Sequence, residues 1–365
     1  MLVHMTHLLA PVPDSDLDDL YRRLAATRRP MLPQGVGWKR GTDADFLAQL
    51  LAYWRDRYDW RTHEARILAL PWEAVGSGDR ALRVVHQRAS STSKAPAVVL
   101  LHGWPDSILR FQRLLPLLAD THVVIPALPG FPFSYELTQP GMTVVAMASL
   151  VADSMQALGY DQYVVSAGDV GADIAEQLAA AHPDRISALH LTNISPLHAV
   201  FADRSALDAE DCAYLDTVAV WQRREGGYIA QQSTKPHTLA VGLADSPAGL
   251  AAWLVEKLWS WSDVPFLEDD LLTWISAYWF TGTIGTSFTP YVEFAPPVPY
   301  VSTPTVLSAF AHDTKPAPRG FASRFVNVQE FIEHEHGGHF AAWEQPERYA
   351  DDLRQAIALG HASLA

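Results

Sequence analysis

The first sixty residues carry the hydrophobic periodicity of two amphipathic helices. In the first, leucines recur at helical spacing behind a group of acidic residues, at Leu17, Leu20 and Leu24. In the second, large apolar residues recur in the same way, at Phe46, Leu50, Trp54 and Tyr58. Thr42 is the predicted N-cap of this second helix. The following segments, RILALPWEAV and ALRVVHQRA, flank the turn sequence GSGD and predict a β-hairpin.

Between about residues 95 and 195, short apolar segments alternate with helical ones. The predicted strands are Ala97–Leu101, His122–Pro126, Gln162–Ser166 and Ile186–Thr192. Because these segments are apolar on both sides, they predict a parallel sheet that is buried on both faces. The strand pattern resumes at Pro304–Phe310 and Phe325–Phe331, and a helix is predicted from Trp343.

The segment between these two groups of strands is helical and aromatic. It holds half of the twelve tryptophans, namely Trp221, Trp253, Trp259, Trp261, Trp274 and Trp279. A helical block inserted between strands of one sheet predicts a lid over that sheet. The predicted organisation is therefore an N-terminal extension of helices and hairpin (1–90), an α/β core (91–197 and 301–365) and a helical lid (198–300). In the core, a mostly parallel sheet carries helices on both faces.

Charge and composition exclude several classes of partner. The chain of 365 residues has a formal charge of −14 and no cluster of Lys or Arg, so nucleic acid and anionic membranes are unsuitable ligands. The single cysteine, Cys212, forms no intrachain disulfide. No run of eighteen apolar residues and no signal-peptide pattern is present. We therefore expect a soluble, cytoplasmic protein.

The segment after the third core strand has the pattern of a nucleophile turn. Asp169 lies between a strand and a helix, with small or short residues around it in the sequence AGDVGA. A strained turn that projects one side chain above a sheet needs little bulk there, and α/β-hydrolases place their nucleophile on such an elbow. A helix N-cap is an equally good interpretation of Asp169 taken alone. Asp173, one turn further, is predicted to be a surface acid.

The identity of the elbow residue indicates the chemistry. A carboxylate that attacks an alkyl carbon forms an ester, which water can then hydrolyse, whereas a serine would form an ether that is a dead end. Asp169 therefore predicts attack on an epoxide or an alkyl halide.

Other residues supply the remaining parts of such a site. The HGWP turn at His102–Pro105 follows a strand, so the N–H groups of Trp104 and Val170 are candidates for an oxyanion hole. Asp313 and His339 follow the last two strands, in the chain order nucleophile, acid, histidine. His334, His336 and His339 also allow a metal site, but no matching carboxylates or thiolates accompany them. We therefore predict that His334 and His336 are surface residues.

An epoxide, unlike a halide, requires a proton donor for its departing oxygen. A tyrosine suits this role because its pKa near ~10 keeps it protonated at neutral pH. Tyr228 and Tyr291 lie in the predicted lid. From their spacing alone, either one is as well explained by core packing.

The chain resembles the microsomal-type epoxide hydrolases from about residue 12 to its C-terminus. The resemblance rests on YDWR, HGWP, the elbow Asp, the stretch QQSTKPHTLAVGLADSPAGLAAWLVEKLWSWSD and GGHFAAWEQPE. It implies an α/β-hydrolase fold with Asp169 as nucleophile and His339 as base. It further implies that Asp313 is the orienting acid and that Tyr228 and Tyr291 are the paired donors.

The resemblance also sets the remaining expectations. We expect Trp104, Pro105 and Phe340 to line the substrate pocket. The family elbow reads Gly-Gly-Asp-Trp-Gly, so Ala167 and Val170 are departures, and Val170 leaves a roomier pocket. The membrane anchor of the vertebrate members is missing, which predicts a soluble, bacterial-type relative.

Epoxide hydrolysis to a vicinal diol is therefore the predicted function. The expected substrates are water and an apolar epoxide, which includes aromatic epoxides. We expect no cofactor and no metal. Assembly into a homodimer is left open. Two alternatives remain. One is a haloalkane or haloacid dehalogenase with the same nucleophile, and the other is a non-catalytic ligand-binding homologue.

Overall fold

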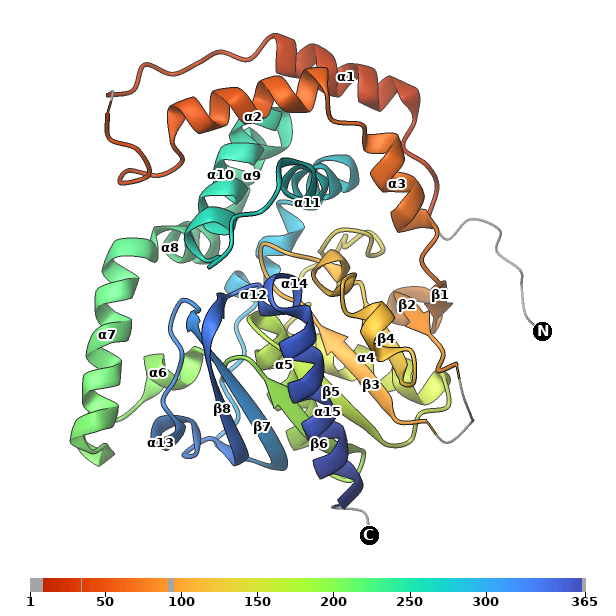
Figure 1. Cartoon of the computed structure of the whole chain (residues 1–365), viewed down its shortest axis with the longest axis vertical. Coiled ribbons are helices and arrows are strands. Elements are labelled where there is room, and N and C mark those ends of the chain that lie inside the picture. Colours follow the sequence, from red (N-terminus) through yellow and green to blue (C-terminus); the bar gives the residue numbers. More distant parts are fainter. Residues whose placement is uncertain (1–8, 34, 91–94, 363–365) are drawn as a thin grey trace.

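The protein is built around one twisted sheet of eight strands, seen in a computed structural model that describes residues 9–33, 35–90 and 95–362 (Figure 1). The strand order is β1-β2-β4-β3-β5-β6-β7-β8. Strand β2 pairs antiparallel with both β1 and β4, and from β4 onward in this order each strand pairs parallel with the next. The predicted mostly parallel sheet is confirmed. Its strands are β1 Trp72–Val75, β2 Leu82–Gln87, β3 Ala97–Leu101, β4 His122–Pro126, β5 Tyr163–Ala167, β6 Ile186–Leu191, β7 Val301–His312 and β8 Val326–Gly338.

Helices cover both faces of this sheet. The central strands β3 and β5 are buried along their whole length, as their continuous apolar sequences predict. Helix α15 packs against β5, β6 and β7, and α5 packs against the same strands from the other face, with α4 beside it (Figure 1). The helices of this core are α4 Val144–Ala157, α5 Val170–Ala181, α13 Arg319–Ala322, α14 Ala341–Glu344 and α15 Pro346–Ala362.

A block of helices lies between β6 and β7 in the chain, in the segment predicted as a lid. Side-chain caps mark where its longer helices begin: Asp208 accepts a hydrogen bond from Asp211 N–H at α7, and Ser246 accepts one from Gly249 N–H at α10. The helices are α6 Leu197–Phe201, α7 Ala209–Glu225, α8 Gly227–Thr234, α9 Pro236–Asp245, α10 Pro247–Ser260, α11 Glu268–Thr281 and α12 Thr289–Val292.

The N-terminal helices pack on this block rather than on the sheet. They are α1 Asp14–Ala25, α2 Ala44–Asp56 and α3 Trp60–Leu68. Helices α1 and α2 contact α10, and α2 and α3 contact α11 (Figure 1). Tyr58 Oη lies 3.0 Å from Thr273 Oγ1, and the rings of Trp38 and Trp259 stack with their centroids 4.5 Å apart. Since β1 and β2 extend the sheet, the N-terminal segment joins the sheet to the helical block.

Two local predictions in this N-terminal segment are wrong. Asp43, not Thr42, caps α2 by accepting hydrogen bonds from the N–H groups of Asp45 and Phe46. The Thr42 hydroxyl instead donates to the carbonyl of Ala252 in α10, a partner 210 residues away. The predicted β-hairpin itself is confirmed by the antiparallel pairing of β1 and β2, but its first strand begins only at Trp72, and the first three residues of RILALPWEAV end helix α3.

No single helix in the described ranges is both long and apolar enough to cross a membrane. Helices α9 and α10 reach the necessary length and composition only when taken together, and the chain bends by 117° between them.

Helix α5 begins in close contact with the end of β3. A Cβ atom on Gly171 would overlap the carbonyl oxygen of Leu101, which is backbone and has no room to move. We predict that Gly171→Ala lowers the free energy of unfolding by about 1–3 kcal/mol. The measurement is urea denaturation followed by circular dichroism.

Gly242→Ala is the matched control for this substitution. Gly242 lies inside α9, and a Cβ there would meet nothing within 4 Å. Removing a glycine from a helix interior should raise stability by about 0.5–1 kcal/mol. Equal effects of the two substitutions would contradict a tight α5–β3 contact.

Candidate active site

The turn between β5 and α5 presents Asp169 in a strained conformation. Its φ of 55° and ψ of −134° are rare for a residue with a side chain. The N–H of Asp169 donates to Asn193 Oδ1 at 2.8 Å, which holds the turn. The carboxylate makes no capping hydrogen bond to α5 within the described chain, and its Oδ1 instead accepts the N–H of Trp104 at 2.7 Å. The side chain of Asp169 therefore does not act as a helix cap.

Small residues around the turn allow this geometry. A Cβ atom on Gly103 would overlap the Asp169 side chain, and one on Gly168 would overlap Thr192 Oγ1. Gly168 and Gly171 flank Asp169, and neither position has room for a larger residue, as inferred from the sequence. Gly103, in the HGWP turn, is restricted in the same way by Asp169 itself.

The last two strands bring Asp313 and His339 to the same place. Strand β7 ends at His312 and β8 ends at Gly338, so the two residues follow directly after parallel neighbours. His339 Nδ1 lies 2.8 Å from Asp313 Oδ1, and its Nε2 lies 3.4 Å from Asp169 Oδ2. The side chain of His339 is 5% exposed and that of Asp169 is 18% exposed. The structure thus places one imidazole between two carboxylates.

These three groups set one another's protonation. Burial by itself would lower the pKa of His339, but the carboxylates of Asp313 and Asp169 outweigh it and raise the pKa to about 9. Burial would raise the pKa of both carboxyl groups, but the imidazole and backbone N–H donors keep each pKa below its ordinary value. The resting site therefore holds two carboxylates and one imidazolium at neutral pH.

The loop that carries His339 is fixed by the segment that follows α10. The N–H of His339 donates to the carbonyl of Trp261 at 2.8 Å, and the N–H of Gly337 donates to Asp263 Oδ2 at 2.8 Å. Glu344 Oε2 accepts the N–H of Asp263 at 2.7 Å. The motifs WSD and GGHFAAWE are widely separated in the sequence, but in the structure they contact each other directly.

A buried ion pair, absent from the sequence predictions, joins the His339 loop to the HGWP turn. Arg110 is 1% exposed and donates to the carbonyl of His339 at 2.7 Å and to Asp106 Oδ2 at 2.8 Å. Asp106 Oδ1 accepts the N–H of Gly103 at 2.8 Å. The four-residue spacing of Asp106 and Arg110 was the only sequence signal for this pair.

Tyr228 and Tyr291, from the helical block between β6 and β7, lie together on the ring of Trp104. Tyr228, from α8, stacks on Trp104 with centroids 5.3 Å apart, and Tyr291, from α12, meets it edge-on at 6.1 Å. The tyrosine rings themselves are 6.0 Å apart. Burial raises the pKa of both phenols well above the ordinary value, and the charge of Asp169 adds to this effect. Both phenols therefore retain their protons at neutral pH.

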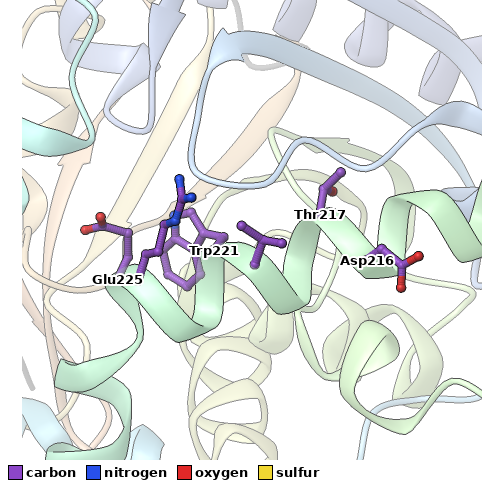
Figure 2. Close-up of a pocket in the computed structure, with 6 residues that line it drawn as sticks. Asp216, Thr217, Trp221 and Glu225 are labelled. Atoms are coloured by element: carbon purple, nitrogen blue, oxygen red, sulfur yellow. The ribbon is translucent and has the colours of Figure 1, made fainter.

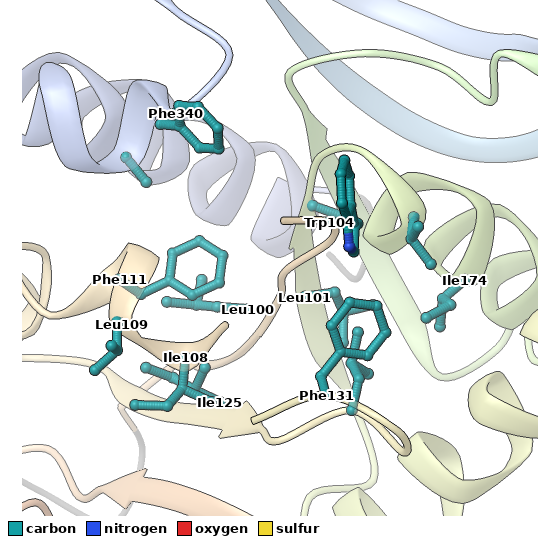
Figure 3. Packing of buried hydrophobic residues seen from close by; sticks show 14 of the residues in the cluster. Leu100, Leu101, Trp104, Ile108, Leu109, Phe111, Ile125, Phe131, Ile174 and Phe340 are labelled. Atoms are coloured by element: carbon teal, nitrogen blue, oxygen red, sulfur yellow. The ribbon is translucent and has the colours of Figure 1, made fainter. Parts of the chain in front are cut away.

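The predicted pocket residues differ in their surroundings. Trp104, Pro105 and Phe340 are all buried. Phe340 packs edge-on against Trp274 and Phe266, and Figure 3 shows it on the side of Phe111, away from Trp104. Its part in substrate binding stays a prediction.

A separate surface pocket of about 500 Å³ is lined by residues of α7 (Figure 2).

Two polar residues that were predicted to be exposed are not. His334 Nε2 lies 2.6 Å from Asp352 Oδ2, and its side chain is 8% exposed, whereas His336 is 67% exposed as predicted. Asp173 accepts a hydrogen bond from the Ser195 hydroxyl, and burial raises its pKa to about 8.

Among the described residues, no three His, Cys, Asp or Glu side chains are grouped as metal ligands.

The charge on His339 should make stability depend on pH. Its pKa is about 9 in the folded protein, against an ordinary value of 6.5, so folding favours the protonated form. That stabilisation is complete below pH 6.5 and is lost as the pH rises through 9. We predict that the stability difference between the protein and His339→Gln falls by about 3 kcal/mol over this range, measured by urea denaturation. A difference that does not change with pH would contradict the charged triad.

Comparisons with known proteins show which family the chain resembles. Residues 5–111 match the family model described as "Epoxide hydrolase N terminus", and residues 96–222 match "alpha/beta hydrolase fold". A Stigmatella aurantiaca protein named "Putative epoxide hydrolase" is 35% identical over 95% of this chain and 83% of its own length. Epoxide hydrolase 1 of Sus scrofa is 28% identical over 95% of this chain and 87% of its own.

Solved structures confirm the fold. The structure of Aspergillus niger epoxide hydrolase matches with a TM-score of 0.86 and 27% identity, over 96% of this chain and 94% of that one. None of these relatives carries the name of a dehalogenase or a receptor, so the two alternative functions gain no support from them. Because the similarity extends over both the N-terminal helices and the hydrolase core, this chain belongs to the epoxide hydrolase family.

Proposed function

We propose that the protein opens an epoxide by attack of the Asp169 carboxylate and releases a vicinal diol by hydrolysis of the resulting ester. The observation that carries this proposal is the convergence on Asp169 of the Trp104 N–H, at 2.7 Å, and His339 Nε2, at 3.4 Å. Oδ1 is held by the backbone donor, which leaves Oδ2 as the attacking atom. Attack forms the bond from Oδ2 to carbon and breaks a carbon–oxygen bond of the epoxide.

Tyr228 and Tyr291 then serve as donors to the departing oxygen. Their protons are retained at neutral pH because burial raises both pKa values. Their rings both contact the indole ring of Trp104, and the backbone N–H of Trp104 binds the nucleophile. The proton donors and the nucleophile therefore lie on the same wall of the site. This pairing supports an epoxide as substrate, since a halide leaves without a proton.

Formation of the ester changes the state of His339. The Asp169 carboxylate is one of the two charges that raise the pKa of His339, and esterification removes that charge. The pKa of the imidazole then falls, so that it can lose its proton and act as a base towards water. Asp313 keeps the ring oriented, at 2.8 Å from Nδ1.

The second step regenerates the carboxylate. Water attacks the ester carbon as His339 takes its proton, and the oxyanion forms where the N–H groups of Trp104 and Val170 point. These two N–H groups already lower the pKa of Asp169, which supports their role as donors to negative charge at this carboxyl group. The aromatic side chains around the site, among them Trp104 and Trp261, favour an apolar substrate, aromatic epoxides included.

Oxygen labelling tests the covalent route. In a single turnover of styrene oxide by excess enzyme in ¹⁸O-water, the diol should carry no label, because its new oxygen comes from Asp169. The label should appear in the peptide that contains Asp169, measured by mass spectrometry. Labelled diol in the first turnover would show direct attack by water and sink the ester proposal.

Asp169→Asn tests the same route by kinetics, with Asp79→Asn, at an exposed turn, as the matched control. The first substitution should lower kcat by at least about 10³-fold because the amide is a poor nucleophile. The control should leave kcat unchanged.

The tyrosines are tested by their effect on the first step. We predict that Tyr228→Phe and Tyr291→Phe each slow ester formation by about 10²-fold, since a positioned proton donor contributes about that much. The rate of ester hydrolysis should change little in either variant. Rapid-quench measurement of the covalent enzyme by intact mass separates the two steps. Unchanged ester formation in both variants would remove the tyrosines from the mechanism.

A further inference from the structure

A buried lysine lies against the ring of Tyr228. Lys257 is in α10, and its side chain is only 6% exposed, which is uncommon for lysine. Its Nζ is 4.8 Å from the centre of the Tyr228 ring and 5.7 Å from that of Trp261. At these distances, an ammonium group interacts with the electron-rich face of an aromatic ring.

Burial and two carboxylates act on the acidity of the same phenol. Burial and the carboxylate of Asp169 raise the pKa of Tyr228, and Glu256 adds to the rise, while the neighbouring Tyr291 opposes it by a hydrogen bond. These effects keep the proton on Tyr228 but also make it a weaker acid. The arrangement holds the donor protonated and leaves it poorly suited to giving up its proton.

Lys257 is the cation placed to oppose these charges. A groove of about 620 Å³ runs beside Tyr228, and Lys257 and Glu256 both line it, with Arg224 and Glu225 further charged groups along its wall. Of these charged groups, Lys257 is the one whose ammonium nitrogen lies over the Tyr228 ring. Glu256 Oε2 lies 2.5 Å from Lys257 Nζ and so neutralises part of its field.

We propose that Lys257 is a positioning residue whose ammonium group, over the ring of Tyr228, stabilises the negative charge that the phenol acquires as its proton moves to the epoxide oxygen. This inference rests on the proposed role of Tyr228. Asp169 forms its bond to carbon, the carbon–oxygen bond of the epoxide breaks, and the phenol proton passes to the released oxygen. The phenolate then takes up a proton from solvent, and this balances the proton that the His339 imidazolium releases to solvent once the charge of Asp169 is gone. When His339 later takes the proton of the attacking water, the resting imidazolium is restored.

The physical basis is a difference between two states of one ring. A phenolate ring is richer in electrons than a phenol ring, so a cation over its face binds the phenolate more tightly. The interaction therefore favours the transition state over the resting state, which is the condition for accelerating a step. Glu256 weakens this effect, so removing Lys257 and removing the Glu256 charge should act in opposite directions.

The first test is the rate of ester formation in single turnovers at neutral pH. Lys257→Met should slow this step by roughly ten-fold, and Lys257→Arg, which keeps the charge, should restore most of the rate. Glu256→Gln should make the step faster than in the unaltered protein. Ester hydrolysis should be unchanged in all three variants, since Tyr228 has no part in it.

The second test measures the acidity of residue 228 directly. Tyr228 itself has a pKa well above the ordinary value, so a polyfluorinated tyrosine, which is far more acidic, is placed at this position to bring the titration below the ordinary lysine pKa of about 10.4. Its pKa, followed by ultraviolet absorbance in the folded protein, should rise by about one unit in Lys257→Met and fall in Glu256→Gln. A purely packing role for Lys257 would not move this pKa in opposite directions.

The outcomes separate this inference from the proposed function. If Tyr228→Phe slows ester formation but Lys257→Met does not, and the fluorotyrosine pKa is unchanged, only the role of Lys257 is overturned. If Tyr228→Phe leaves ester formation unchanged, the proposed role of Tyr228 fails first. If Lys257→Met and Glu256→Gln shift the pKa in the same direction, the electrostatic account is also rejected.

Discussion

The imidazole of His339, held between the carboxylates of Asp313 and Asp169, is the interaction on which the rest of the site depends. The three residues follow three different strands, and β5 and the pair β7–β8 run parallel, with their carboxyl ends at one edge of the sheet. The sheet therefore brings together groups that are up to 170 residues apart in the chain. The two carboxylates raise the pKa of the imidazole between them. Loss of one carboxylate charge would lower that pKa, so that the imidazolium could release its proton and act as a base.

Loops alone would not hold this geometry, and the structure fixes them from two sides. From below, the Arg110 guanidinium joins the His339 carbonyl to Asp106, which in turn holds the HGWP turn. From the side of the helical block, the carbonyl of Trp261 accepts the N–H of His339. The N-terminal helices pack on α10 and α11, so they support the same helical block (Figure 1). A shift of this helical block would therefore move the histidine loop as well.

The site also keeps groups of the same kind in different protonation states. Asp169 is stabilised as a carboxylate by N–H donors and an imidazolium, whereas burial raises the pKa of Asp173, one helix turn away, to about 8. The phenols of Tyr228 and Tyr291 are kept protonated by burial and by the charge of Asp169. Such opposed environments at close range are characteristic of acid–base sites.

The sequence by itself determined the strands, the elbow and the order of Asp169, Asp313 and His339. Apolar runs and small turn residues are local signals, and the ends of parallel strands meet wherever the sheet forms. Only the tertiary structure decided which polar residues are buried and what they contact. Local spacing marked His334 and Asp173 as exposed, and it gave no role to Arg110 or Lys257. Burial and charge pairing arise between segments far apart in the chain, so no local pattern records them.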